Sequence, residues 1–461
     1  MTERRAKIMA TLGPATWGEP VLRELIAAGA DVVRLNLSHG TEEEHRETIA
    51  RVRRVARAAG RHVPVVLDLM GPRYRLGLLP AEPRTLREDE IVRLGAAADG
   101  ADLPVDDPDF LAHLVPGERV LIDQGAIELR IEAREGSVLR ARAIDGGPVG
   151  SRKGLNLPDS TLPFLISPKD ARDIAFAVAE DADYLAASYV GEAAHVEAIR
   201  ALVEKSGGRI PILAKIERAT ACEHLDEICA AADAVMVARG DLGVEVPLAT
   251  VPVWQKEILA AARRAGKPGI VATQMLESMI GEPRPTRAEA TDVANAVFDG
   301  ADALMLSGET TIGRYPLEAV RTMDRIVLEA EAYERKRRPA RESFRPLGPA
   351  LAAPDAQAPD LPAPRRAYDL DPAAGAGGND PSLEVPDLVS AAAVFAAGEL
   401  GVARIVAWSQ SGFTARLAAR YRPRVPIVAI TPDERVARRL QLVWGVRPLL
   451  AGGTVEHLDG L

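Results

Sequence analysis

The amino-acid sequence predicts an α/β fold. We expect a (β/α)8 TIM barrel, with a small β-barrel lid domain inserted after its third strand and an α/β domain at the C-terminal end. The first observation is that eight short apolar segments alternate with helix-like segments. Such alternation is typical of βαβ units whose parallel strands are buried on both faces. The second observation is that polar residues follow the ends of the apolar segments. The third is that two stretches of different composition interrupt the alternation of apolar and helix-like segments.

The eight expected strands are short and rich in Val, Ile, Leu and Ala. They cover residues 7–13, 31–37, 64–70, 184–190, 210–216, 234–242, 269–275 and 303–309. Helical patterns over residues 41–60, 167–180, 285–300 and 316–335 begin with Thr, Ser-Pro or Pro, which are common helix-start residues. Eight strands that alternate with helices predict a closed barrel.

The interruptions divide the chain into further parts. Residues 73–158 contain short alternating runs bounded by Gly or Pro, which predict a β domain. Its insertion after the third strand places it over the face where barrel enzymes carry their sites, where it would act as a lid. The barrel then comprises residues 1–72 and 159–338. Residues 339–386 are rich in Pro and Ala and predict a disordered linker, and residues 387–461 predict the C-terminal α/β domain.

Composition excludes several classes of protein. The net charge of −9 argues against a nucleic-acid partner that relies on bulk positive charge. No apolar run approaches the ~20 residues that span a bilayer, and the charged N-terminus lacks the apolar segment of a signal peptide. We therefore expect a cytoplasmic protein with neither a membrane nor a nucleic acid as partner.

Polar side chains cluster at or just after the C-terminal ends of seven of the eight expected strands. A salt bridge at the rim would explain any single one, but burying the whole set would be costly without a function. The cluster therefore predicts an active site at this rim. Its members are Arg34, Asn36, Ser38, His39, Asp68, Arg75, Ser188, Lys215, Glu217, Arg239, Asp241, Thr273, Ser307 and Glu309.

The residue types in this cluster favour phosphoryl transfer. Glu217 and Asp241 follow adjacent strands and could hold one Mg²⁺, leaving positions for substrate oxygens. Lys215 lies two residues before Glu217 and could stabilise negative charge beside the metal. Arg34 and Arg75 carry guanidinium groups suited to phosphate or carboxylate. Lid closure would add the Lys153 region, so a small anionic substrate is expected.

Ten segments across residues 7–330 carry a family resemblance, which a further segment at 439–446 extends. They include R-L-N-L-S-H-G (34–40), K-G-L-N-L-P (153–158), A-K-I-E (214–217), M-V-A-R-G-D-L-G-V-E-V-P (236–247) and M-L-S-G-E-T (305–310). The sequence thereby resembles the pyruvate kinase family. The resemblance implies transfer of a phosphoryl group from phosphoenolpyruvate to ADP, which gives pyruvate and ATP. It also implies Mg²⁺ or Mn²⁺ as cofactor and a homo-oligomer, which is a tetramer in the family.

The resemblance also implies a role for each matching residue. The metal would bind Glu217 and Asp241, Lys215 would stabilise the transferring phosphoryl group, and Arg34 would hold it. Thr273 and the backbone N–H groups of Gly240 and Asp241 would hold the substrate carboxylate. The proton path would use Ser307 and Thr273. The nucleotide would face His39, Arg75 and Lys153, and in K⁺-dependent members the K⁺ site is formed by Asn36, Ser38 and Asp68.

The third-strand motif departs from the usual family pattern. It reads L-D-L-M-G-P-R-Y-R (67–75), so Leu69, Met70 and Arg73 replace the usual Thr, Lys and Glu. A fixed cation near the substrate can supply the charge that K⁺ would provide. We therefore expect Arg73 to act as a K⁺ surrogate and K⁺ not to be required.

The C-terminal domain departs further. Phe413 occupies a position that is basic in the family's phosphate-binding loop. The resemblance also leads us to expect that the helix and closing strands with which family members usually continue are missing here. We therefore expect a domain that is incomplete relative to the family and lacks regulation by a sugar bisphosphate. Two alternatives stay open at this point. One is another phosphoenolpyruvate or pyruvate enzyme on the same barrel, and the other is a catalytically weak paralogue that binds metabolites and regulates a partner.

Overall fold

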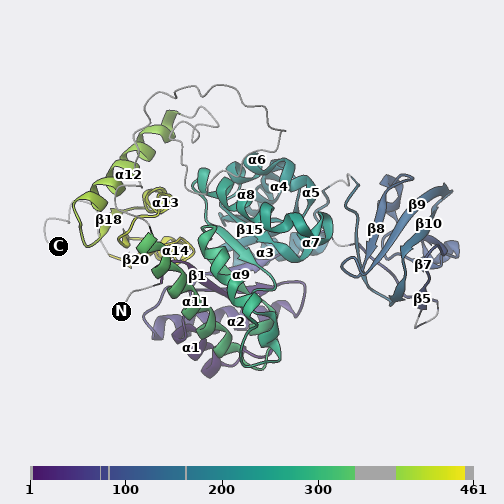
Figure 1. The fold of residues 1–461 in the computed structure, drawn as a ribbon, viewed down its shortest axis with the longest axis horizontal. Coiled ribbons are helices and arrows are strands. Elements are labelled where there is room, and N and C mark those ends of the chain that lie inside the picture. Colours follow the sequence, from purple (N-terminus) through teal and green to yellow (C-terminus); the bar gives the residue numbers. More distant parts are fainter. Residues whose placement is uncertain are drawn as a thin grey trace.

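The computed structural model describes residues 4–72, 74–80, 82, 84–160, 164–337 and 381–451. Within this part of the chain the C-terminal domain, the barrel and the inserted domain lie in a row (Figure 1). Arg73 and residues 339–380 of the predicted linker lie outside the described residues. No helix among the described residues combines the length and apolar character needed to cross a membrane.

The central domain is a closed barrel of eight parallel strands, which confirms the predicted fold class. The strand order is β1-β17-β16-β15-β14-β13-β3-β2. The barrel strands are β1 (Lys7–Thr11), β2 (Val32–Asn36), β3 (Val65–Asp68), β13 (Tyr184–Val190), β14 (Ile212–Ile216), β15 (Ala234–Ala238), β16 (Gly269–Ala272) and β17 (Ala303–Leu306).

Helices surround the barrel, and several begin where the sequence supplies a cap. Thr41, Ser167 and Thr286 each form a capping box with the acidic residue three positions later. The helices are α1 (Glu19–Ala27), α2 (Glu42–Ala58), α3 (Pro168–Ala179), α4 (Ala193–Lys205), α5 (Ala219–Glu223), α6 (Leu225–Ala231), α7 (Arg239–Glu245), α8 (Val251–Arg264), α9 (Arg287–Phe298), α10 (Gly308–Thr311) and α11 (Pro316–Arg337).

One expected strand is shorter than its apolar run suggested. The run over 234–242 was expected to be a single strand, but β15 ends at Ala238 and Arg239–Glu245 forms α7. Beyond Ala238 the sequence contains two glycines and no longer offers a continuous apolar surface to bury. The chain therefore turns at the rim, which puts Asp241 in the first turn of a helix.

The inserted domain has its own sheet and its own core. Seven strands pair in the order β4-β12-β8-β9-β10-β6-β7, and β11 pairs with β5 in a second sheet. Buried Leu94, Ile122 and Leu139 belong to a core separate from that of the barrel. The strands are β4 (Tyr74–Arg75), β5 (Arg84–Leu86), β6 (Ile91–Gly95), β7 (Leu103–Pro104), β8 (Arg119–Ile122), β9 (Ile127–Glu135), β10 (Val138–Asp145), β11 (Gly147–Val149) and β12 (Gly154–Asn156).

The C-terminal domain is a three-stranded parallel sheet, β18-β19-β20, with helices. Its first helix begins at Pro381, inside the residues assigned to the linker, because proline is well tolerated at the first helical position. The described elements are α12 (Pro381–Glu399), β18 (Ile405–Trp408), α13 (Phe413–Arg420), β19 (Ile427–Thr431), α14 (Glu434–Leu440) and β20 (Val446–Leu450).

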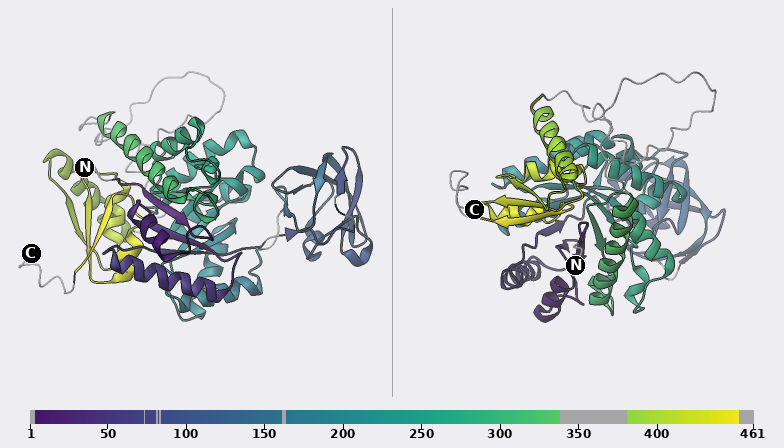
Figure 2. Two further views of the ribbon diagram at one scale, coloured as in Figure 1. Left: turned by 90° about the horizontal axis from the view of Figure 1, so that it is seen from below. Right: turned by 60° about the vertical axis from the view of Figure 1, so that its left-hand side comes forward.

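The two smaller domains occupy opposite ends of the barrel (Figure 2). The inserted domain follows β3 at the C-terminal ends of the strands. The C-terminal domain contacts the other end: Arg438 bonds to Asp183, just before β13, and the Lys7 side chain at the start of β1 bonds to the Val446 carbonyl. The rim that carries the polar cluster therefore faces the inserted domain.

Candidate active site

Lys215 is the centre of a buried ionic cluster at the C-terminal ends of the barrel strands. Its Nζ atom lies 2.7 Å from Glu217 Oε1, 2.7 Å from Ser188 Oγ and 3.4 Å from Asp68 Oδ1. Burial pulls the pKa of Lys215 down, but the charges of Asp68 and Glu217 outweigh it and leave the pKa raised. The lysine is therefore held as a cation.

Arg34 is joined to the same cluster from β2. Its Nε donates to Asp68 Oδ2 at 2.6 Å, and its Nη1 donates to Thr11 Oγ1 at 3.1 Å. Burial raises the pKa of Asp68, but Arg34 and Lys215 outweigh it and lower the pKa below its usual value. Asp68 thus fixes two cations side by side, an arrangement that suits a phosphoryl group.

Glu217 and Asp241 were predicted to hold a divalent metal, and their surroundings fit one. The Glu217 side chain is fully buried, and its Oε2 accepts a hydrogen bond from Tyr189 N at 2.7 Å. Its Oε1 lies 2.7 Å from the Lys215 ammonium group, which is a charge-assisted contact. Burial, reinforced by the charge of Asp241 and opposed by Lys215, raises the pKa of Glu217 to about 7. A buried carboxylate in this state would be stabilised by a further cation.

The described residues contain no group of three or more His, Cys, Asp or Glu side chains arranged for a metal. Two carboxylates are an incomplete ligand set for Mg²⁺, which keeps water and takes substrate oxygens as ligands. The geometry therefore fits a metal that arrives together with an anionic substrate.

Thr273 lies at the end of β16 in a backbone conformation that is rare for a threonine. Its φ is +71°, and its Oγ1 accepts a hydrogen bond from Gly240 N at 2.8 Å. Arg239 donates to the backbone carbonyls of Ala272 and Thr273 and to Asp292 Oδ1, 2.7 Å away. The predicted rim residue Arg239 is thus turned into the loop that follows β16, and it holds the strained backbone of Thr273 in place.

Ser307, at the end of β17, has a buried hydroxyl group. No described residue forms a hydrogen bond with its Oγ. Its backbone N donates to Glu309 Oε2 at 2.7 Å, and Glu309 Oε1 accepts from Leu276 N at 3.0 Å. Glu309 is therefore occupied in joining two loops, whereas the Ser307 hydroxyl has hydrogen-bonding capacity left for a ligand.

The three residues predicted to face a nucleotide are not brought to the Lys215 cluster. Lys153 pairs with Asp123 at 2.7 Å within the inserted domain. Arg75 donates to the carbonyl of Arg152 at 3.1 Å. His39 is exposed at the rim of the barrel, where its carbonyl accepts a hydrogen bond from a neighbouring histidine.

Two of the three residues predicted to form a K⁺ site, Asn36 and Asp68, have side-chain oxygens that are engaged with the protein itself. The Asn36 Oδ1 atom accepts a hydrogen bond from Ser38 N at 3.1 Å. Both carboxylate oxygens of Asp68 contact cationic side chains, Arg34 on one side and Lys215 on the other. The predicted K⁺ surrogate, Arg73, lies outside the described residues.

Sequence reasoning missed three contributors to this site. Thr11, on the one strand to which no polar rim residue was assigned, receives the hydrogen bond from Arg34. Tyr189 supplies the backbone N–H that orients Glu217 and has a φ of +58°. Gly71 packs so closely on Ser188 that an added Cβ would lie 2.9 Å from the serine Cβ. Thr11 could have been found from the sequence, because it is a polar residue at the end of an apolar run and directly before L-G-P. The contributions of Tyr189 and Gly71 depend on backbone geometry, which the sequence does not show.

Comparison with known proteins agrees with this geometry. Residues 3–320 match the family model "Pyruvate kinase, barrel domain", and residues 387–459 match "Pyruvate kinase, alpha/beta domain". A pyruvate kinase of Mycobacterium tuberculosis is 41% identical over 99% of this chain and 90% of its own length. Pyruvate kinases of Agrobacterium vitis (38%; 98% and 88%) and Corynebacterium efficiens (39%; 100% and 89%) are also similar. The chain therefore belongs to the pyruvate kinase family of phosphotransferases.

Proposed function

We propose that this enzyme transfers the phosphoryl group of phosphoenolpyruvate to ADP and so forms pyruvate and ATP. The observation that carries the proposal is the buried Lys215, which Glu217, Asp68 and Ser188 hold as a cation at the barrel rim. Phosphoryl transfer needs fixed positive charge around the moving group more than it needs covalent chemistry.

Lys215 and Arg34 are proposed to bind the phosphoryl group from two sides. Asp68 contacts both cations, so their positions are set before substrate arrives. Lys215 would also stabilise the enolate oxygen that is left after transfer. Preorganised charges of this kind act in the transition state without a reorganisation cost.

The substrate carboxylate is proposed to bind at the start of α7. Thr273 Oγ1 and the backbone N–H groups of Gly240 and Asp241 are the assigned donors. In the structure the Gly240 N–H is bonded to Thr273 Oγ1, so a bound carboxylate would replace that partner. The Gly240 N–H would then be free for the anionic group, whereas the Thr273 O–H, which donates to the Ala272 carbonyl, would have to turn toward it.

Ser307 and Thr273 are proposed to lie on the proton path to the enolate carbon. The unpartnered Oγ of Ser307 supports this role, because a buried hydroxyl without a hydrogen bond is otherwise costly. Neither residue has to ionise, since a hydroxyl can pass a proton from water to carbon.

Glu217 and Asp241 are proposed to hold Mg²⁺ or Mn²⁺. The bound ion would supply positive charge to the oxygens of the phosphoryl group. The burial of Glu217, which raises its pKa to about 7, supports this assignment, because a nearby cation would stabilise the buried carboxylate. His39, Arg75 and Lys153 are proposed to contact ADP after the inserted domain closes over the rim.

K⁺ is proposed not to be required. The proposal is supported by the engagement of Asp68 with Arg34 and Lys215 and of Asn36 with Ser38. Turnover should be equal in K⁺ and in a quaternary ammonium salt at the same ionic strength. Activation of tenfold or more by K⁺ would show that the idea is wrong.

The reaction is tested by mixing the protein with phosphoenolpyruvate, ADP and Mg²⁺ and measuring both products. Equal amounts of pyruvate and ATP are expected. Pyruvate without ATP would indicate a hydrolase or lyase on the same barrel. Ligand binding without turnover would instead favour a regulatory paralogue.

Self-association and a cytoplasmic location are also proposed. Helix α12 exposes Val385 at 66%, Leu388 at 63% and Val389 at 63%, which supports a homo-oligomer such as the tetramer implied by the family. The free, buried Cys222 and Cys229 suit a reducing compartment. Sedimentation analysis of the protein and of Leu388→Glu should show a smaller species for the variant, whereas equal masses would count against this face.

A further inference from the structure

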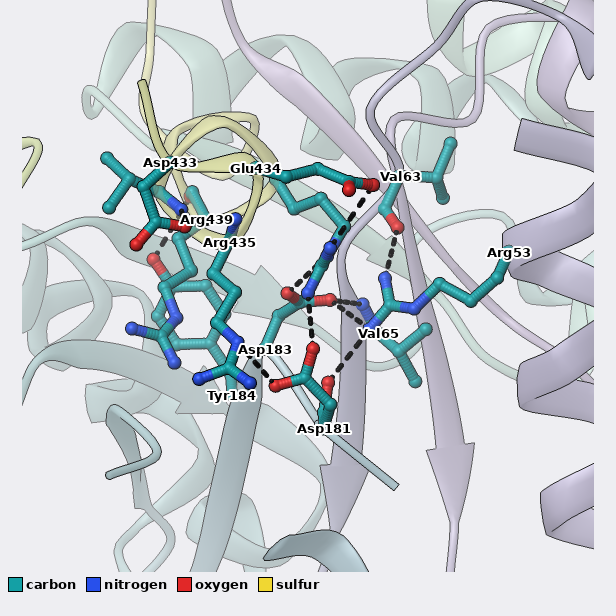
Figure 3. Close-up of polar contacts among 12 residues, drawn as sticks. Arg53, Val63, Val65, Asp181, Asp183, Tyr184, Asp433, Glu434, Arg435 and Arg439 are labelled. Atoms are coloured by element: carbon teal, nitrogen blue, oxygen red, sulfur yellow. Dashed lines mark hydrogen bonds and ion pairs between the residues drawn. The ribbon is translucent and has the colours of Figure 1, made fainter. Parts of the chain in front are cut away.

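The two smaller domains are joined to the barrel in different ways. The C-terminal domain is held by ion pairs: Arg438 binds Asp183 Oδ1 at 2.7 Å, and Arg53 contacts the other carboxylate oxygen at 2.8 Å. Figure 3 shows Asp183 between the arginine side chains of the two domains. The inserted domain instead contacts the barrel where the chain crosses between the two, near Tyr74 and Ser160, and beside both crossings lies Arg218.

Arg218 bonds to the point where the chain returns from the inserted domain. Its Nη2 donates to the Ser160 carbonyl at 3.0 Å. Ser160 is buried, and its Oγ donates to Glu118 Oε2 of the inserted domain at 2.9 Å. One arginine of the barrel is therefore connected, through Ser160, to the body of the inserted domain.

The charge of Arg218 also acts on the first crossing. Burial raises the pKa of Tyr74, and Arg218 opposes this shift. The Tyr74 ring packs on Phe110, with 4.3 Å between the ring centroids, and Phe110 belongs to the core of the inserted domain. Arg218 thus lies close to the chain on its way out of the barrel as well as on its way back.

Helix α7 forms the surface of the barrel against which the inserted domain rests (Figure 1). A Cβ added to Gly125, in the turn between β8 and β9, would lie 3.6 Å from Val244 Cγ1 of this helix. Glu245, the last residue of α7, is 6% exposed, and its Oε2 lies 3.9 Å from Arg218 Nε. Burial raises the pKa of Glu245, while Arg218 and the Asn156 side chain of β12 oppose this shift. Groups of both domains therefore meet at Glu245.

The barrel segments that make these contacts also carry the proposed metal ligands. Arg218 directly follows Glu217, and Glu245 ends the helix whose first turn contains Asp241. Residues four positions apart lie on one face of a helix, about 6 Å apart along its axis. The seat of the inserted domain is thus next to the site over which that domain would close.

We propose that Arg218 and Glu245 are positioning residues that anchor the inserted domain on α7 and fix the point about which it closes. Arg218 holds the Ser160 carbonyl, and Glu245 supplies the counter-charge without which a largely buried arginine would be costly. A fixed anchor limits the orientations that the domain must give up when it closes over a nucleotide. The role in closure rests on the proposed reaction, whereas the anchor itself does not.

The anchor is tested by a distance measurement that needs no turnover. Spin labels are attached to Thr85→Cys in the inserted domain and Lys205→Cys in the barrel, both exposed positions, in the full-length protein without ligands. The native cysteines are buried. Pulsed electron paramagnetic resonance should show one narrow distance distribution, and Arg218→Met and Glu245→Gln should each broaden it at least ~2-fold. An unchanged width in either variant would overturn the proposal.

A matched control is available within the barrel. Arg200 of α4 donates to the Ala231 carbonyl at 2.6 Å and contacts Asp233 at 3.1 Å, so Arg200→Met removes bonds of the same kinds as Arg218→Met. It should leave the distance distribution unchanged. Equal broadening by Arg200→Met would mean that loss of any such arginine loosens the protein, and this result would also overturn the proposal.

Kinetics then separate an anchor from a role in the barrel site. Arg218→Met should raise KM for ADP at least ~5-fold, because Arg75 and Lys153 of the inserted domain are the proposed nucleotide contacts. KM for phosphoenolpyruvate should change less than about twofold, because the Lys215 cluster of the barrel would hold that substrate. Equal increases in both constants would show that Arg218 acts through Glu217 and would refute the proposed role in closure. If the protein does not catalyse the reaction at all, the distance measurement still decides whether the anchor exists.

Discussion

Lys7 should make the stability of this protein depend on pH in alkaline solution. It begins β1, is only 6% exposed, and its Nζ donates to the Val446 carbonyl of the C-terminal domain at 2.9 Å. Burial lowers the pKa of Lys7 from 10.5 to about 8, with Asp31 opposing this shift and Arg4 adding to it. Below pH 8 the Lys7 side chain therefore carries a positive charge although its burial disfavours that charge.

The sign of the effect follows from proton binding. Between pH 8 and 10.5 the unfolded chain keeps the Lys7 proton that the folded protein has already lost, so the free energy of unfolding rises with pH. The difference of about 2.5 pH units corresponds to about 3 kcal/mol. The penalty of burying the charge is complete below pH 8 and is relieved as the pH approaches 10.5.

The measurement is a difference between wild type and Lys7→Met. Urea unfolding of each is followed by circular dichroism at several pH values between 7 and 10.5. The comparison is needed because burial raises the pKa values of Cys222 and Cys229 to about 12 in the folded protein. The unfolded chain loses these thiol protons at lower pH, so the free energy of unfolding of both proteins falls with pH for this separate reason. The variant also lacks the hydrogen bond to the Val446 carbonyl, which changes its free energy of unfolding by the same amount at every pH.

The stability of wild type relative to the variant should rise by roughly 3 kcal/mol over this range. A difference that stays flat would show that Lys7 keeps its proton, with its charge compensated by Asp31. A difference that falls with pH would reverse the sign and refute the reasoning about burial.

Three substitutions at the rim should affect turnover differently. Lys215→Met should lower kcat by at least ~10³-fold in a coupled assay, since it removes the central cation, and near-normal rates would refute its role. Ser307→Ala should leave the melting temperature within about 2 °C, because its hydroxyl has no hydrogen-bond partner among the described residues, yet it should lower kcat at least ~10-fold. Arg239→Lys should lower kcat by roughly 10²-fold, because it removes a bond that holds the backbone of Thr273 in place, and it should leave the metal dependence unchanged. Unaltered KM and kcat values would show that Arg239 does not position Thr273.

The barrel could be predicted because its strands have a simple signature. Continuous apolar runs mark strands that are buried on both faces. Lys215 lies near the end of one run and Glu217 directly follows it, which places both at one strand end. The direction of a side chain beyond the strand end does not follow from spacing. Arg239 was predicted to belong to the polar cluster at the rim, but its side chain turns toward the carbonyls of Ala272 and Thr273. That choice depends on tertiary hydrogen bonds between segments that are far apart in the chain.

Backbone strain was equally invisible in the sequence. Thr273 and Tyr189 both have positive φ values, and both are residues that disfavour this conformation. Only the surrounding contacts, such as those of Arg239, make it stable. A glycine at either position would have drawn attention to the turn, but a threonine or tyrosine reads as ordinary strand sequence.

The separation of Lys153 from the barrel site does not contradict a role in nucleotide binding. Its partner in the structure is Asp123, and the two side chains are 43% and 39% exposed. Exposed ion pairs contribute about 0–1 kcal/mol, because water screens both charges. A nucleotide phosphate that is partly shielded under a closed lid offers Lys153 a stronger charge than Asp123 does. On the proposed closure of the inserted domain, exchanging one partner for the other would therefore cost little.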